Sequence, residues 1–125
     1  MIAKRTLFGQ SGEALAARHL KRKGYKIIDR NFRTRRGEID IIARHRDTLV
    51  FIEVKTRRSL TFGNPKWAIT PAKRRKISQV ALEYLLKTRG TTRIKSRFDV
   101  VTIQHTADRP MVEVIAHAFE RAYPK

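Results

Sequence analysis

The spacing of apolar residues predicts a first helix near the N-terminus. In "EALAARHLKRK", Ala16, Ala17 and Leu20 recur at the interval that places side chains on one face of a helix. We expect this helix over residues 8–23, because basic residues fill its last turn and a glycine follows. Glu13 shares the same face, so this carboxylate is expected to point inward.

A second helix is expected over residues 71–88. Thr70 suits the N-cap, and Pro71 suits the first helical position. The apolar residues expected on its buried face are Ile77, Val80, Ala81, Tyr84 and Leu85.

Apolar runs between these helices and after them predict strands. The expected strands are residues 25–33, 37–44, 48–56, 96–104 and 111–117. The second and third strands are joined by a short polar turn, which favours an antiparallel hairpin. Residues 57–70 are expected as a loop in which Trp67 is a packed anchor, and residues 118–125 as an irregular end.

The resulting order is α-β-β-β-α-β-β. It predicts an α/β fold, a mixed β-sheet flanked by helices. Neither an internal repeat nor a linker interrupts the pattern, so residues 1–125 are expected to form a single domain.

Charge adds a prediction about partners. The chain of 125 residues carries 29 Lys and Arg against 11 Asp and Glu, for a formal net charge of +18. A field of this sign attracts polyanions, and salt weakens the attraction. Nucleic acid is therefore the expected partner. The aromatic fraction of 8% does not indicate a platform for stacking bases.

Other classes are disfavoured by what the sequence lacks. No apolar run approaches the roughly 18 residues of a membrane span, and no helix is basic on one face and apolar on the other throughout. The N-terminal residues do not resemble a signal peptide, and the absence of cysteine excludes disulfides and thiolate metal sites. We therefore expect a cytoplasmic protein without a membrane partner.

The scarce carboxylates gather where the pattern predicts buried strands, in "GEIDIIARHRDTLVFIEVK" (residues 37–55). Alternate residues of a strand share a face, so Glu38 points the same way as Asp40, and Glu53 the same way as Lys55. One register of the expected hairpin brings Asp40 beside Glu53. Two carboxylates at that distance repel each other, and burial makes their ionisation costlier.

A divalent cation would relieve this repulsion. Mg²⁺ prefers oxygen ligands, often one or two carboxylates together with waters and phosphate oxygens of a substrate. Lys55 would lie beside the cation, where it could hold a water or stabilise charge that develops on phosphorus. A Glu-x-Lys pair by itself is usually a solvated or ion-paired strand face, but the combination with Asp40 favours the metal site.

These residues also carry a resemblance. Asp40 and the run Glu53-Val54-Lys55 resemble the PD-(D/E)XK motif of restriction-endonuclease-like nucleases. In chain order, "GQSGEALAARHL", "GYKIIDRNFR", "GEIDII", "VFIEVKTR", "FGNP" and "RFDVV" resemble the YraN-like family of uncharacterised bacterial proteins, over residues 9–119. The resemblance implies a restriction-endonuclease-like fold, similar to that of archaeal Holliday-junction resolvases.

The resemblance also implies a site. Glu13, Asp40, Glu53 and Lys55 would be catalytic, Asp40 and Glu53 would bind Mg²⁺ or Mn²⁺, and the backbone carbonyl of Val54 would be a third ligand. The sequence departs from the motif in one respect, because "EID" stands in place of "PD" and no proline precedes Asp40. The wider nuclease class tolerates this departure.

Several other residues have two interpretations. Glu38 is either a support for Asp40 or a solvated strand start. Lys73 opposes the dipole of the second helix, which suggests a phosphate or carboxylate partner, although a lysine whose stem snorkels from the core edge is the commoner case. His45 is expected to be exposed near the hairpin turn, and Asp99 to be structural and paired with an Arg.

Basic clusters flank the proposed site at residues 33–36, 55–58, 73–76 and 93–97. The residues expected to bind nucleic acid are Arg35, Arg36, Arg57, Arg58, Lys73, Arg74 and Arg75. Each cluster alone is usually a solvated face, but together they suit contacts to phosphate rather than reading of base edges.

Three functions therefore remain at the level of the sequence. The first is a metal-dependent endonuclease that hydrolyses phosphodiester bonds of DNA, including branched DNA. The second is a non-catalytic, basic nucleic-acid-binding protein that retains the nuclease fold. The third is a basic assembly factor bound to RNA or to an acidic protein. The sequence leaves open whether the chain forms a homodimer.

Overall fold

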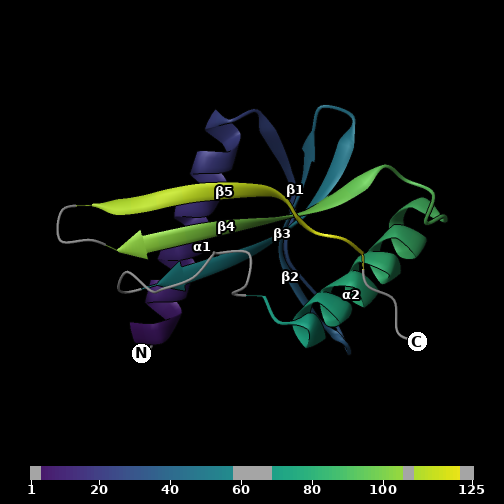
Figure 1. Cartoon of the computed structure of the whole chain (residues 1–125), viewed down its shortest axis with the longest axis horizontal. Helices are drawn as coiled ribbons and strands as arrows, with labels where there is room; N and C mark the ends of the chain where they lie inside the picture. The colour runs from purple at the N-terminus through teal and green to yellow at the C-terminus, as the bar shows by residue number, and fades with distance from the viewer. Residues whose placement is uncertain (1–3, 58–68, 106–108, 122–125) are drawn as a thin grey trace.

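The structure, a computed structural model, describes residues 4–57, 69–105 and 109–121. Its elements are α1 (Lys4–Arg22), β1 (Tyr25–Thr34), β2 (Gly37–His45), β3 (Thr48–Arg57), α2 (Pro71–Arg89), β4 (Ser96–His105) and β5 (Pro110–Phe119). This order confirms the expected α/β class, with a mixed sheet and two helices (Figure 1). No helix among these residues is long and apolar enough to cross a bilayer.

Two boundaries differ from the expectation by more than one residue. The first helix begins at Lys4, so it is longer than predicted. The last strand continues to Phe119, where an irregular end was expected from residue 118 onward. Packing explains this extension, because Ala118 is buried and Phe119 pairs with Phe98 across the sheet with their rings stacked 4.8 Å apart.

The five strands form one sheet in the order β1-β2-β3-β4-β5. β3 and β4 are parallel, whereas the other neighbouring pairs are antiparallel. A parallel pair needs a crossover, and α2 lies in the connection between these two strands. The expected hairpin of β2 and β3 is present, with Ile41 opposite Ile52.

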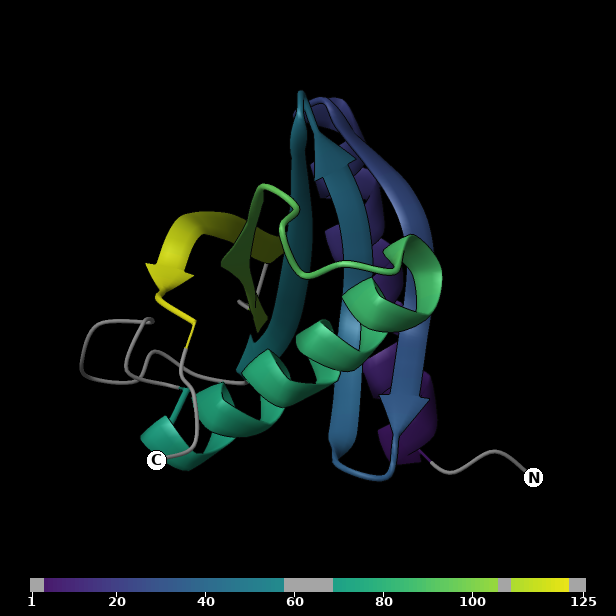
Figure 2. The same ribbon diagram turned by 90° about the vertical axis from the view of Figure 1, so that its right-hand side faces the viewer.

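The helices cover opposite faces of the sheet (Figure 2). On one face Ala16, Ala17 and Leu20 of α1 pack against apolar residues of β2, β3 and β4. On the other face the predicted apolar side of α2 packs around Phe51 of β3. Burial of these two apolar stripes is the main driving force that fixes the layers.

A glycine sets how closely α1 approaches the sheet. A Cβ atom added at Gly12 would lie 2.8 Å from Thr56 Oγ1, which is closer than side chains tolerate. The helix therefore lies against the C-terminal half of β3. This approach brings Glu13, the next residue, close to the carboxylates of β2.

The start of α2 is fixed by its cap. Thr70 Oγ1 accepts a hydrogen bond from the backbone N–H of Lys73 at 3.1 Å, and Pro71 is the first helical residue, as predicted. From this first turn of α2, Lys73 reaches Glu53 of β3.

Candidate active site

The site begins where β2 and β3 stop pairing. The ladder between these strands runs from His45 opposite Thr48 to Ile41 opposite Ile52. At the next position, Asp40 Oδ2 accepts a hydrogen bond from the backbone N–H of Val54 at 2.8 Å. A side-chain carboxylate thus bridges the two strands beyond the end of their ladder.

Glu53 is the second carboxylate of the site, and it is almost completely buried, with 8% of its side chain exposed. Its Oε2 atom accepts no hydrogen bond among the described residues. Lys73 Nζ lies 3.2 Å away as an ion-pair partner, but not in hydrogen-bonding geometry. A buried carboxylate oxygen in this state is a strong potential ligand for a cation.

Asp40 and Glu53 lie close enough to influence each other. Burial first, and then the neighbouring Glu53 carboxyl, raise the pKa of Asp40 to about 7. The hydrogen bond from the Val54 backbone acts in the opposite direction but does not outweigh them. The sequence-based expectation that the hairpin brings these two carboxylates together is therefore met by the geometry.

Two further carboxylates converge on Asp40. Glu13, Glu38 and Asp40 each have a carboxylate oxygen within 4.8 Å of those of the other two. Burial, followed by the Asp40 carboxylate, raises the pKa of Glu13. Glu38 faces this group and also forms an ion pair with Arg33, so it is close to Asp40 rather than isolated at the strand start.

Strand β1 orients the carboxylate of Glu13. Asn31, with its amide nitrogen facing Glu13, donates hydrogen bonds of 3.2 Å to both carboxylate oxygens. Arg30 Nη2 lies 3.8 Å from Glu13 Oε2. Asn31 has a φ of 55°, a left-handed conformation that asparagine tolerates better than most residues. The expectation of an inward Glu13 holds in part, since 21% of its side chain is exposed.

This donor set fits a hard divalent cation. All the candidate side-chain ligands are carboxylates, and Asp40 lies close both to Glu53 and to the pair of Glu13 and Glu38. Mg²⁺ and Mn²⁺ prefer such oxygens over nitrogen or sulfur ligands. The raised pKa values of Asp40 and Glu13 mark a site where carboxylates are buried and crowded together.

Two lysines accompany the carboxylates. Lys55 is half-buried and follows Glu53 at the interval that keeps it on the same strand face. Within the described part of the chain, Lys55 makes no ion pair or hydrogen bond. Lys73 reaches Glu53 from the first turn of α2. The sequence suggests either an anionic partner for Lys73 or a stem that snorkels from the core edge, and the structure shows a carboxylate partner.

The predicted phosphate-binding residues divide into two groups. Arg35 and Arg36 are exposed in the β1–β2 turn, and this turn lies over α2, since a Cβ at Gly37 would meet Lys76 and Val80. Arg75 is exposed on α2.

Arg74, by contrast, is engaged in packing. Its Nε donates a 3.0 Å hydrogen bond to the Ile69 carbonyl, and its guanidinium lies over the Phe119 ring. The side chain of Arg57, and all of Arg58 and Trp67, lie outside the described residues.

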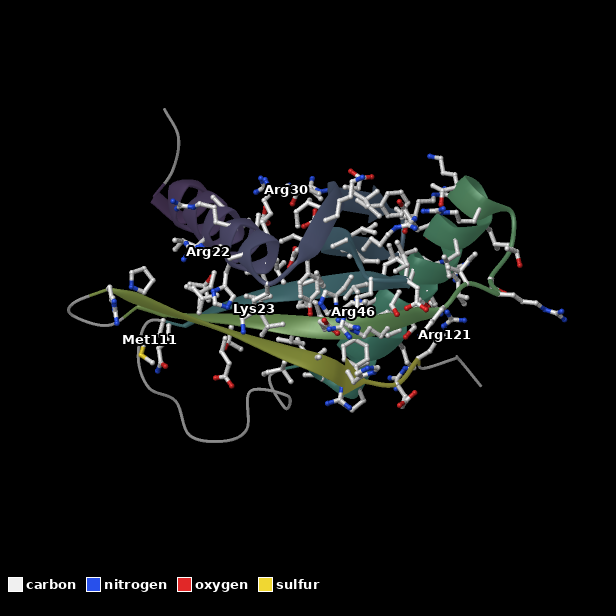
Figure 3. The ribbon with its side chains drawn as sticks, turned by 90° about the horizontal axis from the view of Figure 1, so that it is seen from above. Arg22, Lys23, Arg30, Arg46, Met111 and Arg121 are labelled. Atoms are coloured by element: carbon white, nitrogen blue, oxygen red, sulfur yellow. The ribbon has the colours of Figure 1, made fainter. Side chains whose placement is uncertain are left out.

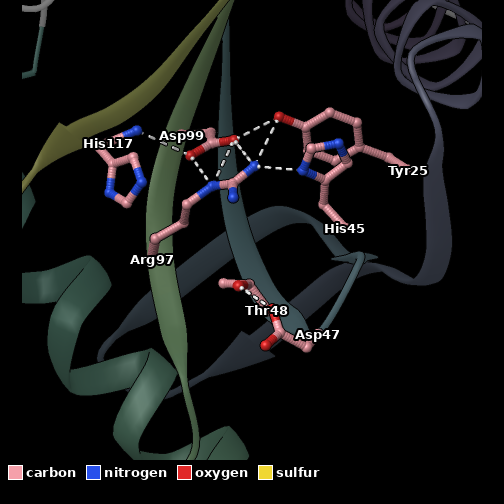
Figure 4. Close-up of polar contacts among 7 residues, drawn as sticks. All are labelled: Tyr25, His45, Asp47, Thr48, Arg97, Asp99 and His117. Atoms are coloured by element: carbon pink, nitrogen blue, oxygen red, sulfur yellow. Dashed lines mark hydrogen bonds and ion pairs between the residues drawn. The ribbon is translucent and has the colours of Figure 1, made fainter.

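A second polar cluster lies at the other end of the strands, and the sequence predicted only part of it (Figure 4). Asp99 is fully buried and paired with Arg97, as expected for a structural Asp. The expectation of an exposed His45 is wrong. This ring is half-buried, stacks on Tyr25 at 4.3 Å, and contacts Arg97 through Nδ1. Pairing of Tyr25 with His45 across β1 and β2 explains its burial.

Comparisons with known proteins identify relatives over nearly the whole chain. The family model described as "Uncharacterised protein family UPF0102" matches residues 12–103. A UPF0102 protein of Geobacter sulfurreducens is 51% identical over 118 residues, which cover 94% of this chain and 91% of the relative. A UPF0102 protein of Chlorobium phaeobacteroides is 52% identical over 97 residues, covering 78% of this chain and 76% of the relative. The names of these relatives give the family and no activity.

Proposed function

We propose that this chain, which belongs to the UPF0102 family, is a metal-dependent endonuclease of the restriction-endonuclease-like type that hydrolyses phosphodiester bonds in DNA. The observation that supports this most is the position of Asp40 at the end of the β2–β3 ladder. There its carboxylate lies beside Glu53 and is held by the Val54 backbone. The sequence resemblance described above implies a fold similar to that of archaeal Holliday-junction resolvases, so branched DNA is the first substrate to test.

Asp40 and Glu53 would hold the metal ion, with the Val54 carbonyl as a further oxygen ligand. A bound Mg²⁺ or Mn²⁺ would neutralise the crowded carboxylates, lower the pKa of a coordinated water and polarise a phosphate oxygen. Glu53 Oε2, which accepts no hydrogen bond among the described residues, and Asp40, whose pKa is raised, would both be stabilised by such an ion.

Lys55 is the residue best placed to stabilise the transition state. Its ammonium group is on the strand face of Glu53 and has no carboxylate partner among the described residues. It would therefore be available to the negative charge that grows on the phosphoryl oxygens during hydrolysis. Glu13, oriented by Asn31 and Arg30, would position the attacking water or accept a proton from it.

The basic surface would bring the substrate to this site. Arg35, Arg36 and Arg75 are exposed on the two elements that flank the carboxylates, and the chain has a net charge of +18. Phosphate contacts of this kind position the backbone and do not read sequence. We therefore expect selection by DNA structure.

The second candidate is a nucleic-acid-binding protein without catalysis. The net charge of +18 is the observation in its favour, because charge alone supports salt-sensitive binding. A binding protein, however, has no use for buried carboxylates that repel phosphate, and the chain retains Asp40, Glu53 and Lys55 together. The third candidate, an assembly factor, predicts RNA or acidic-protein binding and no cleavage.

A cleavage panel separates these functions. The purified protein is incubated with duplex, single-stranded, flap and four-way-junction DNA, and with RNA, with Mn²⁺, with Mg²⁺ or with a chelator. Cleavage of at least one DNA that requires the metal would support the endonuclease. Tight binding with no cleavage under any condition would favour the binding protein.

A further inference from the structure

A cavity of about 260 Å³ lies between the β2–β3 turn and the start of β4. Its lining includes Arg46, Thr48, Lys95, Arg97 and His117. On β2 its nearest member, His45, is five positions from Asp40, or roughly 17 Å along an extended strand. The cavity is therefore separate from the carboxylate site, and a ligand could bind in it whether or not the chain is a nuclease.

Arg97 is held rigidly in the wall of this cavity. Its Nε donates to Asp99 Oδ1 at 3.0 Å, and its Nη2 donates to the hydroxyl of Tyr25 at 3.0 Å. Asp99 is 0% exposed and also accepts hydrogen bonds from the Tyr25 hydroxyl and from the backbone N–H of His117. The guanidinium is thus fixed along one edge by a buried network.

The remaining nitrogen of Arg97 is directed into the cavity. Figure 4 shows it turned away from Asp99 and Tyr25, on the side of Thr48 and Asp47, which also line the cavity. Among the described residues this Nη1 group makes no hydrogen bond. A pre-oriented guanidinium donor of this kind suits an oxyanion such as phosphate.

His45 adds a further contact that holds Arg97 in place. Its Nδ1 lies 3.0 Å from Arg97 Nη2. A guanidinium can only donate, so Nδ1 must accept, and Nε2 carries the proton. His45 therefore holds Arg97 as a hydrogen-bond acceptor, and Nη1 of Arg97 stays the donor on the side of Thr48 and Asp47.

The acidic group of the cavity is already engaged. Asp47 pairs with Lys95 Nζ at 3.2 Å, and both side chains are largely exposed. An exposed ion pair is weak, so Lys95 can turn toward an entering phosphate at small cost. Arg46 adds a cation from the same turn.

An adjoining hollow of about 380 Å³ extends the site toward aromatic residues. It shares Lys95, Arg97 and His117 with the first cavity and adds Phe119 and Ile94. It also includes Glu120, whose charge opposes a phosphate, and Arg121, which Figure 3 places toward the same end of the molecule as Arg46. Phe119 is already stacked on Phe98 and lies under the Arg74 guanidinium, so a nucleobase would contact the apolar lining of this hollow without stacking on that ring.

We propose that the cavity around Arg97 is a phosphate-binding site that takes the phosphate group of a nucleotide, with the base in the adjoining hollow beside Ile94. The chemistry is the same for a free mononucleotide and for a nucleotide within a strand. The experiment therefore includes both.

Binding is followed by NMR on the full chain with three probes: inorganic phosphate, AMP and a short single-stranded oligonucleotide. The Arg97 side chain, the rings of His45 and His117, and the backbone of residues 46–48 should shift with AMP. AMP should bind about tenfold more tightly than phosphate, because its base buries apolar surface in the adjoining hollow. If the oligonucleotide binds at the same residues more tightly than AMP, the ligand is a nucleotide within a strand. If it binds as tightly as AMP or less tightly, the ligand is a free nucleotide.

The variant Arg46→Asn/Lys95→Gln removes both mobile cations and leaves the buried network intact. Arg46 has a φ of 58°, which asparagine tolerates, and Lys95 is exposed. AMP affinity should fall by about tenfold or more.

The control Arg22→Gln/Lys23→Gln removes the same charge from the end of α1 and should bind AMP like the wild type. The proposal is overturned if phosphate and AMP shift none of these residues, or if both double variants bind AMP equally. Asp40→Asn should leave AMP binding unchanged.

Discussion

Asp40 Oδ2 accepts a 2.8 Å hydrogen bond from the backbone N–H of Val54, at the point where the ladder between β2 and β3 ends. This contact fixes the carboxylate between two strands rather than on the open face of one. It holds Asp40 close to Glu53, and Glu13 approaches it from α1. The proposed metal site depends on this arrangement.

Metal binding should require Asp40. Calorimetry with Mn²⁺ should show binding to the wild type and a loss of at least about tenfold in affinity for Asp40→Asn, because the amide cannot supply an anionic ligand. Glu113→Gln changes an exposed carboxylate on β5 and is the matched control. Equal Mn²⁺ affinity in wild type and Asp40→Asn would place the metal elsewhere or exclude it.

The stability of the metal-free protein should depend on Asp40 and pH. Its pKa rises from an ordinary value of 3.8 to about 7 on folding, so the folded protein retains a proton that the unfolded chain releases. The contribution of this proton to the free energy of unfolding is fully present below about pH 4. It is lost as pH rises to about 7, because the unfolded state then binds fewer protons than the folded state.

Urea unfolding of wild type and Asp40→Asn at pH 5 and pH 7.5 measures this effect. The stability of the wild type relative to the variant should fall by about 1–3 kcal/mol between these pH values. Glu113→Gln should keep the pH dependence of the wild type. If Asp40→Asn keeps it as well, Asp40 does not titrate near neutrality. Mn²⁺ affinity should rise over the same range, since the cation displaces the proton.

The basic residues near the carboxylates should account for part of the salt dependence of DNA binding. Replacing Arg35, Arg36 and Arg75 with Gln should reduce the slope of log affinity against log salt by up to about 0.9 per residue for duplex DNA. Replacing Arg22, Lys23 and Lys26 removes the same charge from the end of α1 and the start of β1. An equal loss of slope in both triple variants would indicate general charge attraction rather than a binding face.

The buried pair of Arg97 and Asp99 should be important for stability. Arg97→Leu leaves the carboxylate of Asp99 buried without its cation and should cost about 3–5 kcal/mol in the free energy of unfolding. Arg97→Leu/Asp99→Leu should recover part of this loss, because no buried charge remains unpaired, although the Tyr25 hydroxyl and the His117 backbone N–H lose their acceptor. Arg93→Leu changes an exposed arginine and should cost little. A similar loss in the single and double variants would show that shape, not charge, is limiting.

Local patterns in the sequence were sufficient to predict much of this fold. The apolar face of α2 and its Thr70 cap follow from helical periodicity and from the hydrogen-bonding capacity of threonine. The hairpin of β2 and β3 follows from two alternating runs and a short turn, and it brings Asp40 beside Glu53. Whether these residues bind metal stays a prediction.

Contacts between distant segments were beyond such patterns. Tyr25 and Asp99 are 74 positions apart and meet only because α2 carries the chain across the sheet to β4. The pairing of Lys73 with Glu53 depends on how far the first turn of α2 reaches over β3. The contact of Arg74 with Phe119 could not be predicted either, because it forms only when β5 packs beside α2.

The proposed role of Lys55 and the carboxylates in hydrolysis is tested most directly by measuring DNA cleavage and DNA binding in the same variants. Wild type, Lys55→Ala, and the control Lys87→Ala are assayed with Mn²⁺ for DNA binding and for single-turnover cleavage of the same panel of substrates. Lys87 is exposed near the end of α2. We predict that Lys55→Ala binds DNA and Mn²⁺ nearly as well as wild type but loses about 10²-fold or more in cleavage, while Lys87→Ala retains it. Absence of cleavage by the wild type on every substrate, or cleavage by Lys55→Ala at the wild-type rate, would contradict the proposed role.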